Sequence, residues 1–206
     1  MMIQSIQRTA GLVLICLLAL ILGACSIITP KPPSRVIDPQ VEAATTIEVN
    51  PQYGTLRILR PKTDQTRDSR QILVRRADSS LQVLPRHLWL EKTPDMLRTI
   101  MLNHFHQSGP FIDAHVGGPA DWLLDTRIRS FEAVDLADGR VEVNIELFAR
   151  LIEQRSGQVK NSRTLTVSIP SQSSEPEQII LAFERGLSEW TAQLADWLTQ
   201  GVPLTD

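Results

Sequence analysis

An uncharged apolar run near the N-terminus constrains this chain more than any other feature of its sequence. Residues 10–24 carry no charged side chain, and Arg8 supplies a positive charge just before them. The apolar part of the run, Leu12 to Leu22, is 11 residues long, whereas a transmembrane helix needs about 20 apolar residues. A positive charge followed by a short apolar run is typical of a secretory signal peptide. We therefore expect residues 1–24 to be cleaved from an exported protein.

The end of this run, Leu22-Gly23-Ala24-Cys25, resembles a bacterial lipobox. In such motifs small residues give the signal peptidase access, and the cysteine thiol receives a diacylglyceryl group. The resemblance implies cleavage before Cys25 and acylation of its new amino group, and this covalent lipid is the only cofactor that we expect. Several acyl chains, at about 0.8 kcal/mol per buried methylene, anchor a protein stably. Ser26 follows, and a serine there usually permits export of such lipoproteins to the outer membrane, so we expect an outer-membrane, lipid-anchored protein whose domain faces the periplasm.

The segment after the lipobox has the composition of an extended tether. Residues 26–52 show no sustained apolar period and contain five prolines, which stiffen such segments. At roughly 3.3 Å per residue, these 27 residues would reach about 90 Å at most. The early prolines also disfavour the alternative of an uncleaved N-terminal helix with a chance cysteine. We divide the chain into a signal peptide (1–24), a lipidated cysteine and tether (25–52) and a domain (53–206), and leave open whether the tether is a passive spacer or orders on a partner.

Composition excludes several classes of protein. The net charge is −2, and the pI is near 6.1, so there is no basic field to hold nucleic acid. The chain has two cysteines, Cys16 and Cys25, and both precede the domain, which excludes a disulfide scaffold and a cysteine-ligated zinc site there. Hydrophobic residues make up 42% and charged residues 21%, as in an ordinary globular domain.

The first half of the domain is predicted to hold short strands and one helix. Apolar residues alternate at Leu56 and Ile58, at Ile72 and Val74, and at Leu81 and Val83, and Pro85 is expected to stop the third of these strands. Thr93-Pro94-Asp95 can cap a helix that ends before Gly109-Pro110.

The second half is predicted to hold three strands and a long helix. Residues 122–136 form one strand, Asp138-Gly139 is a hairpin turn, and a strictly alternating strand follows from Val141 to Leu151. A third strand ends at Pro170, and the last helix repeats apolar residues every three or four positions from Ile180 to Trp197. We expect an α+β fold: an antiparallel β-sheet covered on one face by two α-helices, preceded by the signal peptide and the extended tether.

This order of elements resembles the PqiC-like ABC-type transport auxiliary lipoproteins, the auxiliary components of MCE-type lipid transport systems. The resemblance covers about residues 53–199 and the lipobox, and rests on the following segments: Ile72-Leu73-Val74-Arg75-Arg76, Leu88-Trp89-Leu90, Thr93-Pro94-Asp95-Met96-Leu97, Asp121-Trp122-Leu123-Leu124, Ile128-Arg129-Ser130-Phe131-Glu132, Val143 to Ala149, and Phe183 to Leu198. It implies a protein that performs no bond chemistry and docks an MCE conduit at the outer membrane. The implied partners are an MCE-domain protein and, through it, an inner-membrane permease and ATPase; a homo-oligomer is left open.

The sequence contains no pattern typical of a catalytic or metal site. There is no Gly-x-Ser-x-Gly elbow, and no glycine loop followed by lysine that would cradle phosphate. His104 and His106 lie two positions apart in the predicted helix, and so point about 200° away from each other. His104 falls on the apolar stripe and is predicted to be a core residue. We therefore expect neither an enzyme nor a metal site.

Three residues are candidates for contact with a partner. Trp89 precedes the helix cap and is either a surface anchor or a core residue. Arg127 and Arg129 lie on the predicted solvent face of their strand and are either solvated or meet an acidic partner surface. Two other functions stay open: a structural or assembly lipoprotein of the envelope, such as a β-barrel plug or a Tol-type module, and a periplasmic carrier that holds one acyl chain.

Overall fold

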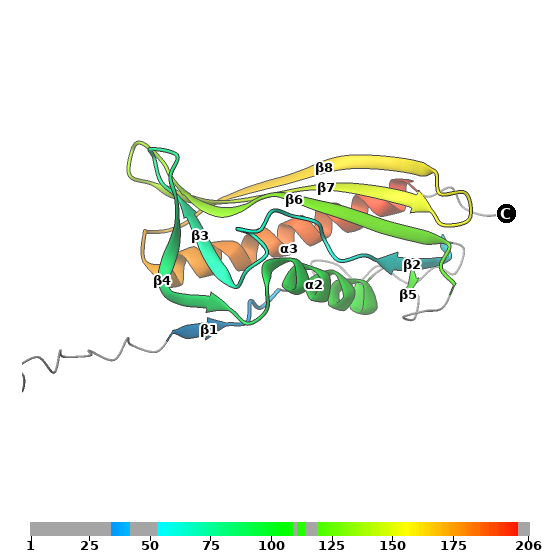
Figure 1. Cartoon of the computed structure of the whole chain (residues 1–206), viewed down its shortest axis with the longest axis horizontal. Coiled ribbons are helices and arrows are strands. Elements are labelled where there is room, and N and C mark those ends of the chain that lie inside the picture. Colours follow the sequence, from blue (N-terminus) through cyan, green and yellow to red (C-terminus); the bar gives the residue numbers. More distant parts are fainter. Residues whose placement is uncertain (1–33, 42–52, 109–110, 114–118, 202–206) are drawn as a thin grey trace, which may run out of the picture. The chain divides into compact units, whose positions relative to one another are not determined.

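A meander of three long strands runs along the fold (Figure 1). The computed structural model describes residues 34–41, 53–108, 111–113 and 119–201; the signal peptide, Cys25 and most of the expected tether lie outside these ranges. The strands are β6 (Trp122–Asp135), β7 (Val141–Glu153) and β8 (Val159–Pro170), and each pairs with the next in antiparallel fashion. Every second residue of β7 from Val141 to Leu151 is buried, because one face of the strand lies on the core. The predicted alternation and the Asp138-Gly139 hairpin are confirmed.

Five further strands extend the meander into one eight-stranded sheet. They are β1 (Arg35–Ile37), β2 (Thr55–Ile58), β3 (Gln71–Arg75), β4 (Leu81–Trp89) and β5 (Ile112–Asp113). β3 and β4 are antiparallel, whereas β1 pairs with β4, β2 with β5, and both β2 and β3 with β6 in parallel. The predicted α+β class is confirmed, but the sheet is mixed and the expectation of an antiparallel sheet holds only for the meander and for β3–β4.

The parallel pairing arises because residues 55–75 follow one edge of β6 in a single direction. β2 lies beside the start of β6 and β3 beside its end. Between them the Leu59 amide donates to the Leu124 carbonyl at 3.0 Å, and the Lys62 amide donates to the Thr126 carbonyl at 2.9 Å. The polar segment that separates the two predicted strands therefore leaves the edge of β6 and rejoins the same edge farther along.

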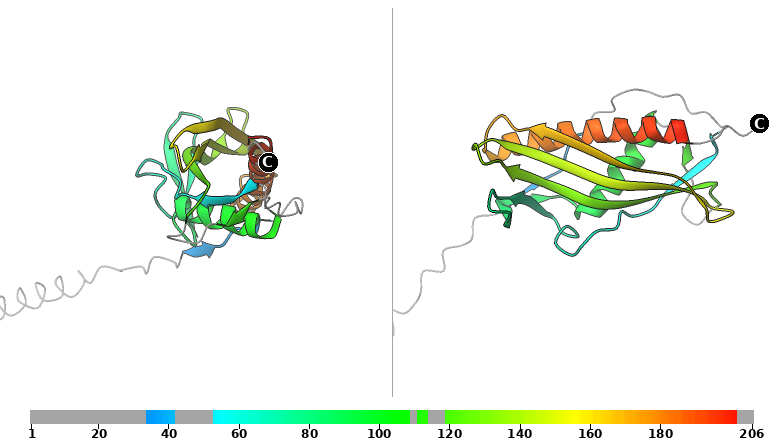
Figure 2. Two further views of the ribbon diagram at one scale, coloured as in Figure 1. Left: turned by 90° about the vertical axis from the view of Figure 1, so that its right-hand side faces the viewer. Right: turned by 90° about the horizontal axis from the view of Figure 1, so that it is seen from above.

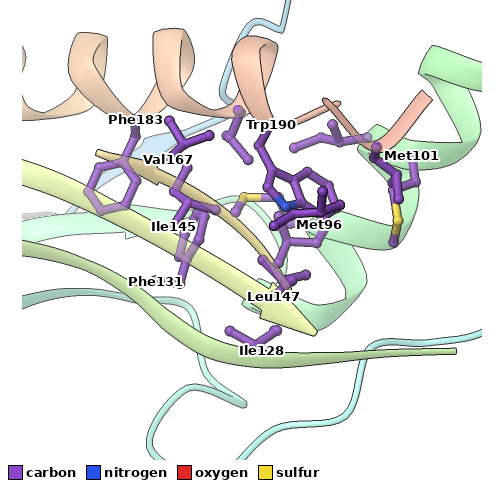
Figure 3. Packing of buried hydrophobic residues seen from close by; sticks show 14 of the residues in the cluster. Met96, Met101, Ile128, Phe131, Ile145, Leu147, Val167, Phe183 and Trp190 are labelled. Carbon is purple, nitrogen blue, oxygen red and sulfur yellow. The ribbon is translucent and has the colours of Figure 1, made fainter. Parts of the chain in front are cut away.

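Two helices, α2 (Thr93–Ser108) and α3 (Pro176–Gly201), cover one face of this sheet (Figure 2). Phe183 and Trp190 of α3 point toward Ile145 and Val167 of the strands, and Met96 of α2 reaches the same cluster (Figure 3). Phe183 and Trp190 are both fully buried. The apolar stripes predicted for the two helices thus meet in one core.

The first described strand lies in the range that was expected to be tether. β1 pairs with β4, and its Ile37 side chain is only 9% exposed and belongs to the core. The folded unit therefore begins at Ser34, not at residue 53. The proline content misled the prediction, because Pro39 lies two residues after the end of β1 and does not interrupt its hydrogen bonds. Three residues are also too few to show an apolar period.

β4 also continues beyond Pro85, where it was expected to stop. The register of β3 against β4 shifts between Gln71 and Leu73, which lie opposite Leu88 and Val83. The extra residues of β4 form a bulge in which Arg86 adopts a positive φ of 62°. A bulge accommodates proline because its residues leave the hydrogen-bond ladder.

Candidate interaction surface

The structure decides between the two interpretations of Trp89. Its side chain is 0% exposed and lies at centroid distances of 5.3 Å from Phe183 and 6.1 Å from Phe131. The indole therefore joins β4, β6 and α3 in the core. The interpretation of Trp89 as a contact residue for a partner is therefore wrong, because a side chain without exposed surface cannot meet a partner. Cys25, the predicted lipidation site, lies outside the described residues.

Arg127 and Arg129 are both exposed on the face of β6 that points away from the helices. Arg127 lies between Phe148 of β7 and Lys62 on the other side. A register shift between Ile128 and Ser130 places a bulge at Arg129, whose guanidinium carbon lies 5.3 Å from the centroid of the Phe148 ring. Phe148 thus lies opposite Arg127 in the strand register and next to the guanidinium of Arg129, whose positive charge the ring face attracts.

The two arginines differ in their ionic partners. Arg129 Nη1 donates to Glu146 Oε1 at 3.3 Å, and both side chains are partly solvated. Arg127 makes no ion pair with any residue in the described ranges. Contact of Arg127 and Arg129 with an acidic partner surface stays a prediction, and the geometry leaves Arg127 available for it.

The same strand, β6, also contains two buried acidic residues that the sequence analysis missed. Asp125 is 4% and Glu132 is 2% exposed. Lys62 Nζ lies 3.2 Å from Asp125 Oδ1, and the Arg150 guanidinium also donates to this carboxylate. Buried carboxylates require such partners, so the acids do not add free negative charge to the surface.

The Glu132 carboxylate is held between two arginines. Arg67 Nη2 donates to Glu132 Oε2 at 2.6 Å, and Arg75 Nε donates to Glu132 Oε1 at 2.8 Å. Burial opposes ionisation of Glu132, but the hydrogen bonds from Arg75 and Arg67 outweigh it and hold the pKa of the carboxyl below its usual value. The sequence offered one sign of this cluster, the arginines spaced along residues 67–76.

Arg67 also fastens the excursion between β2 and β3 onto the sheet. Its Nη1 donates to Asp64 Oδ2 at 2.7 Å, and the Asp64 carboxylate accepts from the Thr66 amide at 2.9 Å. Arg60 links the same part of the chain to α2, because its Nε donates to Asp95 Oδ1 at 2.6 Å. Ion pairs therefore hold the segment between β2 and β3 to both β6 and α2.

A second group of features surrounds β1. A pocket of about 250 Å³ lies between residues 38–41 and α2, and another of about 420 Å³ lies between β1 and the start of α3. His104 borders the first pocket and is 5% exposed, which confirms it as a core residue. Burial lowers the pKa of His104, so its ring is neutral at pH 7. Carboxylates line both pockets: Asp38, Glu91, Glu177 and Glu184.

Two features are absent from the residues that the structure describes: a metal-binding group and a membrane-spanning helix. In these ranges no three His, Cys, Asp or Glu side chains are grouped so that they could hold a metal ion. The helices of the described part of the chain also include none that is both long and apolar enough to cross a membrane. What the outer face of β6 does present is two exposed arginines, Arg127 and Arg129.

Comparison with known proteins gives a family match and two similar structures. The family described as "ABC-type transport auxiliary lipoprotein component" matches residues 36–195. A crystal structure of a Xanthomonas campestris protein of the DUF330 family superposes with a TM-score of 0.73 at 28% identity, over 81% of this chain and 97% of that one. An uncharacterized protein of known structure shares the fold at a TM-score of 0.60 and 16% identity, over 77% of this chain and 99% of that one. No curated protein matches the chain.

Proposed function

The chain belongs to the family of ABC-type transport auxiliary lipoprotein components, and from this premise we propose that it is a non-catalytic docking component of an MCE-type lipid transport system. Lipid on Cys25 anchors it in the outer membrane, and its domain faces the periplasm. There it holds the outer-membrane end of a conduit built by an MCE-domain protein. An inner-membrane permease and ATPase supply the energy for transport.

The observation that carries this proposal is the contrast between a closed core and a presented cationic face. The core is one cluster that includes residues of both helices and of most strands, and the buried acids of β6 are neutralised by basic side chains. Arg127 and Arg129 remain exposed on the same strand. Such a surface favours recognition of an acidic protein surface, since charge complementarity steers and orients association.

The test is co-isolation of the full-length lipoprotein, tagged at its C-terminus, from membranes of its native host in mild detergent. We expect an MCE-domain protein at stoichiometric yield. The double variant Arg127→Glu with Arg129→Glu should lower that yield about tenfold, which corresponds to about 1.4 kcal/mol. The matched control is Arg155→Glu with Arg163→Glu, two exposed arginines elsewhere, which should leave the yield unchanged.

Other results would redirect the proposal. Absence of an MCE-domain protein would contradict it, and an outer-membrane barrel in its place would select a structural or assembly role. Equal loss with both double variants would show that Arg127 and Arg129 are not the contact surface. Native mass spectrometry of the domain separates the carrier alternative, because a carrier retains a non-covalent lipid and a docking component has the mass of the bare chain.

A further inference from the structure

We propose that the surface around β1 faces the lipid bilayer, because the chain between the lipid anchor and the fold is only nine residues long. We call residues 25–33 the leash, and the exposed surface formed by Arg35, Val36, Leu90 and Leu181 the β1 surface. The inference rests on the proposed function in one respect: it requires lipid on Cys25. It adds the orientation of the domain on the membrane and the chemistry of the surface that meets it.

The first step is that β1 is fixed to the sheet. Its three residues lie in register with β4, from Arg35 opposite His87 to Ile37 opposite Trp89. The Leu90 amide donates to the Ile37 carbonyl at 2.7 Å. Because Ile37 is buried in the core, release of β1 would expose its side chain as well as break these hydrogen bonds.

The second step is that α3 holds the same segment from its other side. Arg35 Nη1 lies 2.9 Å from Glu177 Oε1, and the Gln40 amide donates to Glu184 Oε1 at 3.0 Å. The ion pair is exposed and contributes little by itself, but Val41 also packs against the core. The family match begins at residue 36, which agrees with β1 being part of the domain. The leash between the lipid anchor and the fold therefore ends just before β1, at residue 33.

The third step is a comparison of lengths. Nine residues (25–33) extend to about 30 Å at most. Helix α3 has 26 residues and is about 39 Å long at 1.5 Å per residue. β1 lies beside the first turns of α3, and the β7–β8 turn lies toward the other end of that helix (Figure 1). A domain with β1 on its membrane-distal end would need a leash longer than α3, so the β1 end must lie toward the bilayer.

The fourth step is the chemistry of the β1 surface. Among the described residues five large apolar side chains are exposed, and three of them, Val36, Leu90 and Leu181, surround β1 at 48–49% exposure. Val36 and Leu181 line the pocket of about 420 Å³ together with Arg35 and Glu184. Apolar side chains within a ring of both charges suit the headgroup region of a zwitterionic bilayer, where apolar contact contributes affinity without a need for anionic lipid.

The experiment compares two insertions in the lipidated protein, reconstituted into phosphatidylcholine vesicles that contain a trace of headgroup-quencher lipid. Twelve Gly/Ser residues are inserted after Pro33, which lengthens the leash, or after Thr46, which lies beyond β1 and does not. A fluorophore is attached through Leu181→Cys or, in the matched control, through Arg155→Cys near the β7–β8 turn. The acylated Cys25 offers no thiol for the label.

We expect the label at position 181 to be quenched at least threefold more than the label at position 155. The insertion after Pro33 should remove this difference, and the insertion after Thr46 should leave it intact. Equal effects of the two insertions would overturn the inference, because they would mean that β1 does not end the leash. Stronger quenching at position 155 would overturn it by reversing the orientation.

The same sample separates failure of this inference from failure of the proposed function. The mass of the N-terminal peptide reports acylation of Cys25, and flotation of the vesicles reports attachment of the protein. An unmodified Cys25 with protein in the aqueous fraction would overturn both proposals. An acylated, vesicle-bound protein with equal quenching at both positions would overturn the orientation alone.

Discussion

Ile37 lies directly opposite Trp89 across the β1–β4 pair, and both side chains belong to the core. One member of the pair, Ile37, lies in the segment that follows the predicted lipid anchor. The other, Trp89, ends the strand that precedes α2. One contact thereby explains why the proline-rich segment is shorter than expected and why Trp89 is not a surface residue. The anchor and the hydrophobic core are linked through this strand.

Replacement of Ile37 by alanine should lower the free energy of unfolding by about 2 kcal/mol, the lower end of the range for loss of a buried isoleucine side chain. The neighbour Val36 is 48% exposed, so Val36→Ala should change stability by less than about 0.5 kcal/mol. Urea denaturation of the two variants measures the difference. Equal small effects would mean that β1 is not bound to the sheet in solution.

Replacement of Glu132 by glutamine should destabilise the domain by about 3 kcal/mol, because it leaves Arg67 and Arg75 without their shared buried carboxylate. Glu146→Gln is the matched control, since its pair with Arg129 is solvated and should cost less than about 1 kcal/mol. Chemical denaturation at pH 7 gives both values. Similar costs for the two variants would contradict the buried cluster.

The same carboxyl predicts how stability depends on pH. The pKa of Glu132 is lower in the folded protein than its ordinary value of 4.5, so its contribution is present above that value and is lost as pH falls through the folded-state pKa. The difference in unfolding free energy between wild type and Glu132→Gln should therefore shrink below about pH 4.5. Denaturation curves from pH 3 to pH 7 test this, and a difference that grows toward low pH would show the opposite sign.

Trp89→Phe should reduce stability by about 1–2 kcal/mol through lost packing against Phe131 and Phe183. It should leave co-isolation of the partner unchanged, because the side chain has no exposed surface. Thermal unfolding and the membrane co-isolation described above measure the two effects. Loss of the partner from a folded Trp89→Phe variant would restore the surface-anchor interpretation.

Gly54→Ala should cost about 1–2 kcal/mol more than Gly157→Ala. Both glycines have a positive φ, of 76° and 69°, so alanine is strained at either position. At Gly54 a Cβ would also lie 2.7 Å from Asp121 Oδ2, which accepts hydrogen bonds from the Thr55 amide and hydroxyl, each at 2.8 Å. At Gly157 a Cβ would meet nothing within 4 Å. Equal midpoints in urea would mean that the Asp121–Thr55 link yields without cost.

The sequence by itself determined the features that depend on neighbouring residues. The alternation from Val141 to Leu151 predicted β7, and the three- and four-residue spacing of apolar residues predicted α3; both are confirmed. The short charge-free run predicts a signal peptide and the lipobox resemblance implies a lipid anchor on Cys25, and these two stay predictions. Each of these patterns is complete within one segment, because the period of a strand or a helix is set by local backbone geometry. The predicted order of elements was sufficient for the family resemblance.

Only the tertiary structure decided the features that depend on distant segments. β1 is a strand because β4 and α3 lie beside it. Trp89 is buried because Phe131 and Phe183 pack against it. Asp125 and Glu132 are tolerated because basic side chains reach them: Lys62, Arg67, Arg75 and Arg150. Charged residues in a strand are usually solvent-facing, so nothing in the sequence next to Asp125 and Glu132 marks them as buried. Pairing between segments that lie far apart in the chain leaves no periodic pattern in the sequence, because each segment contains only one side of the contact.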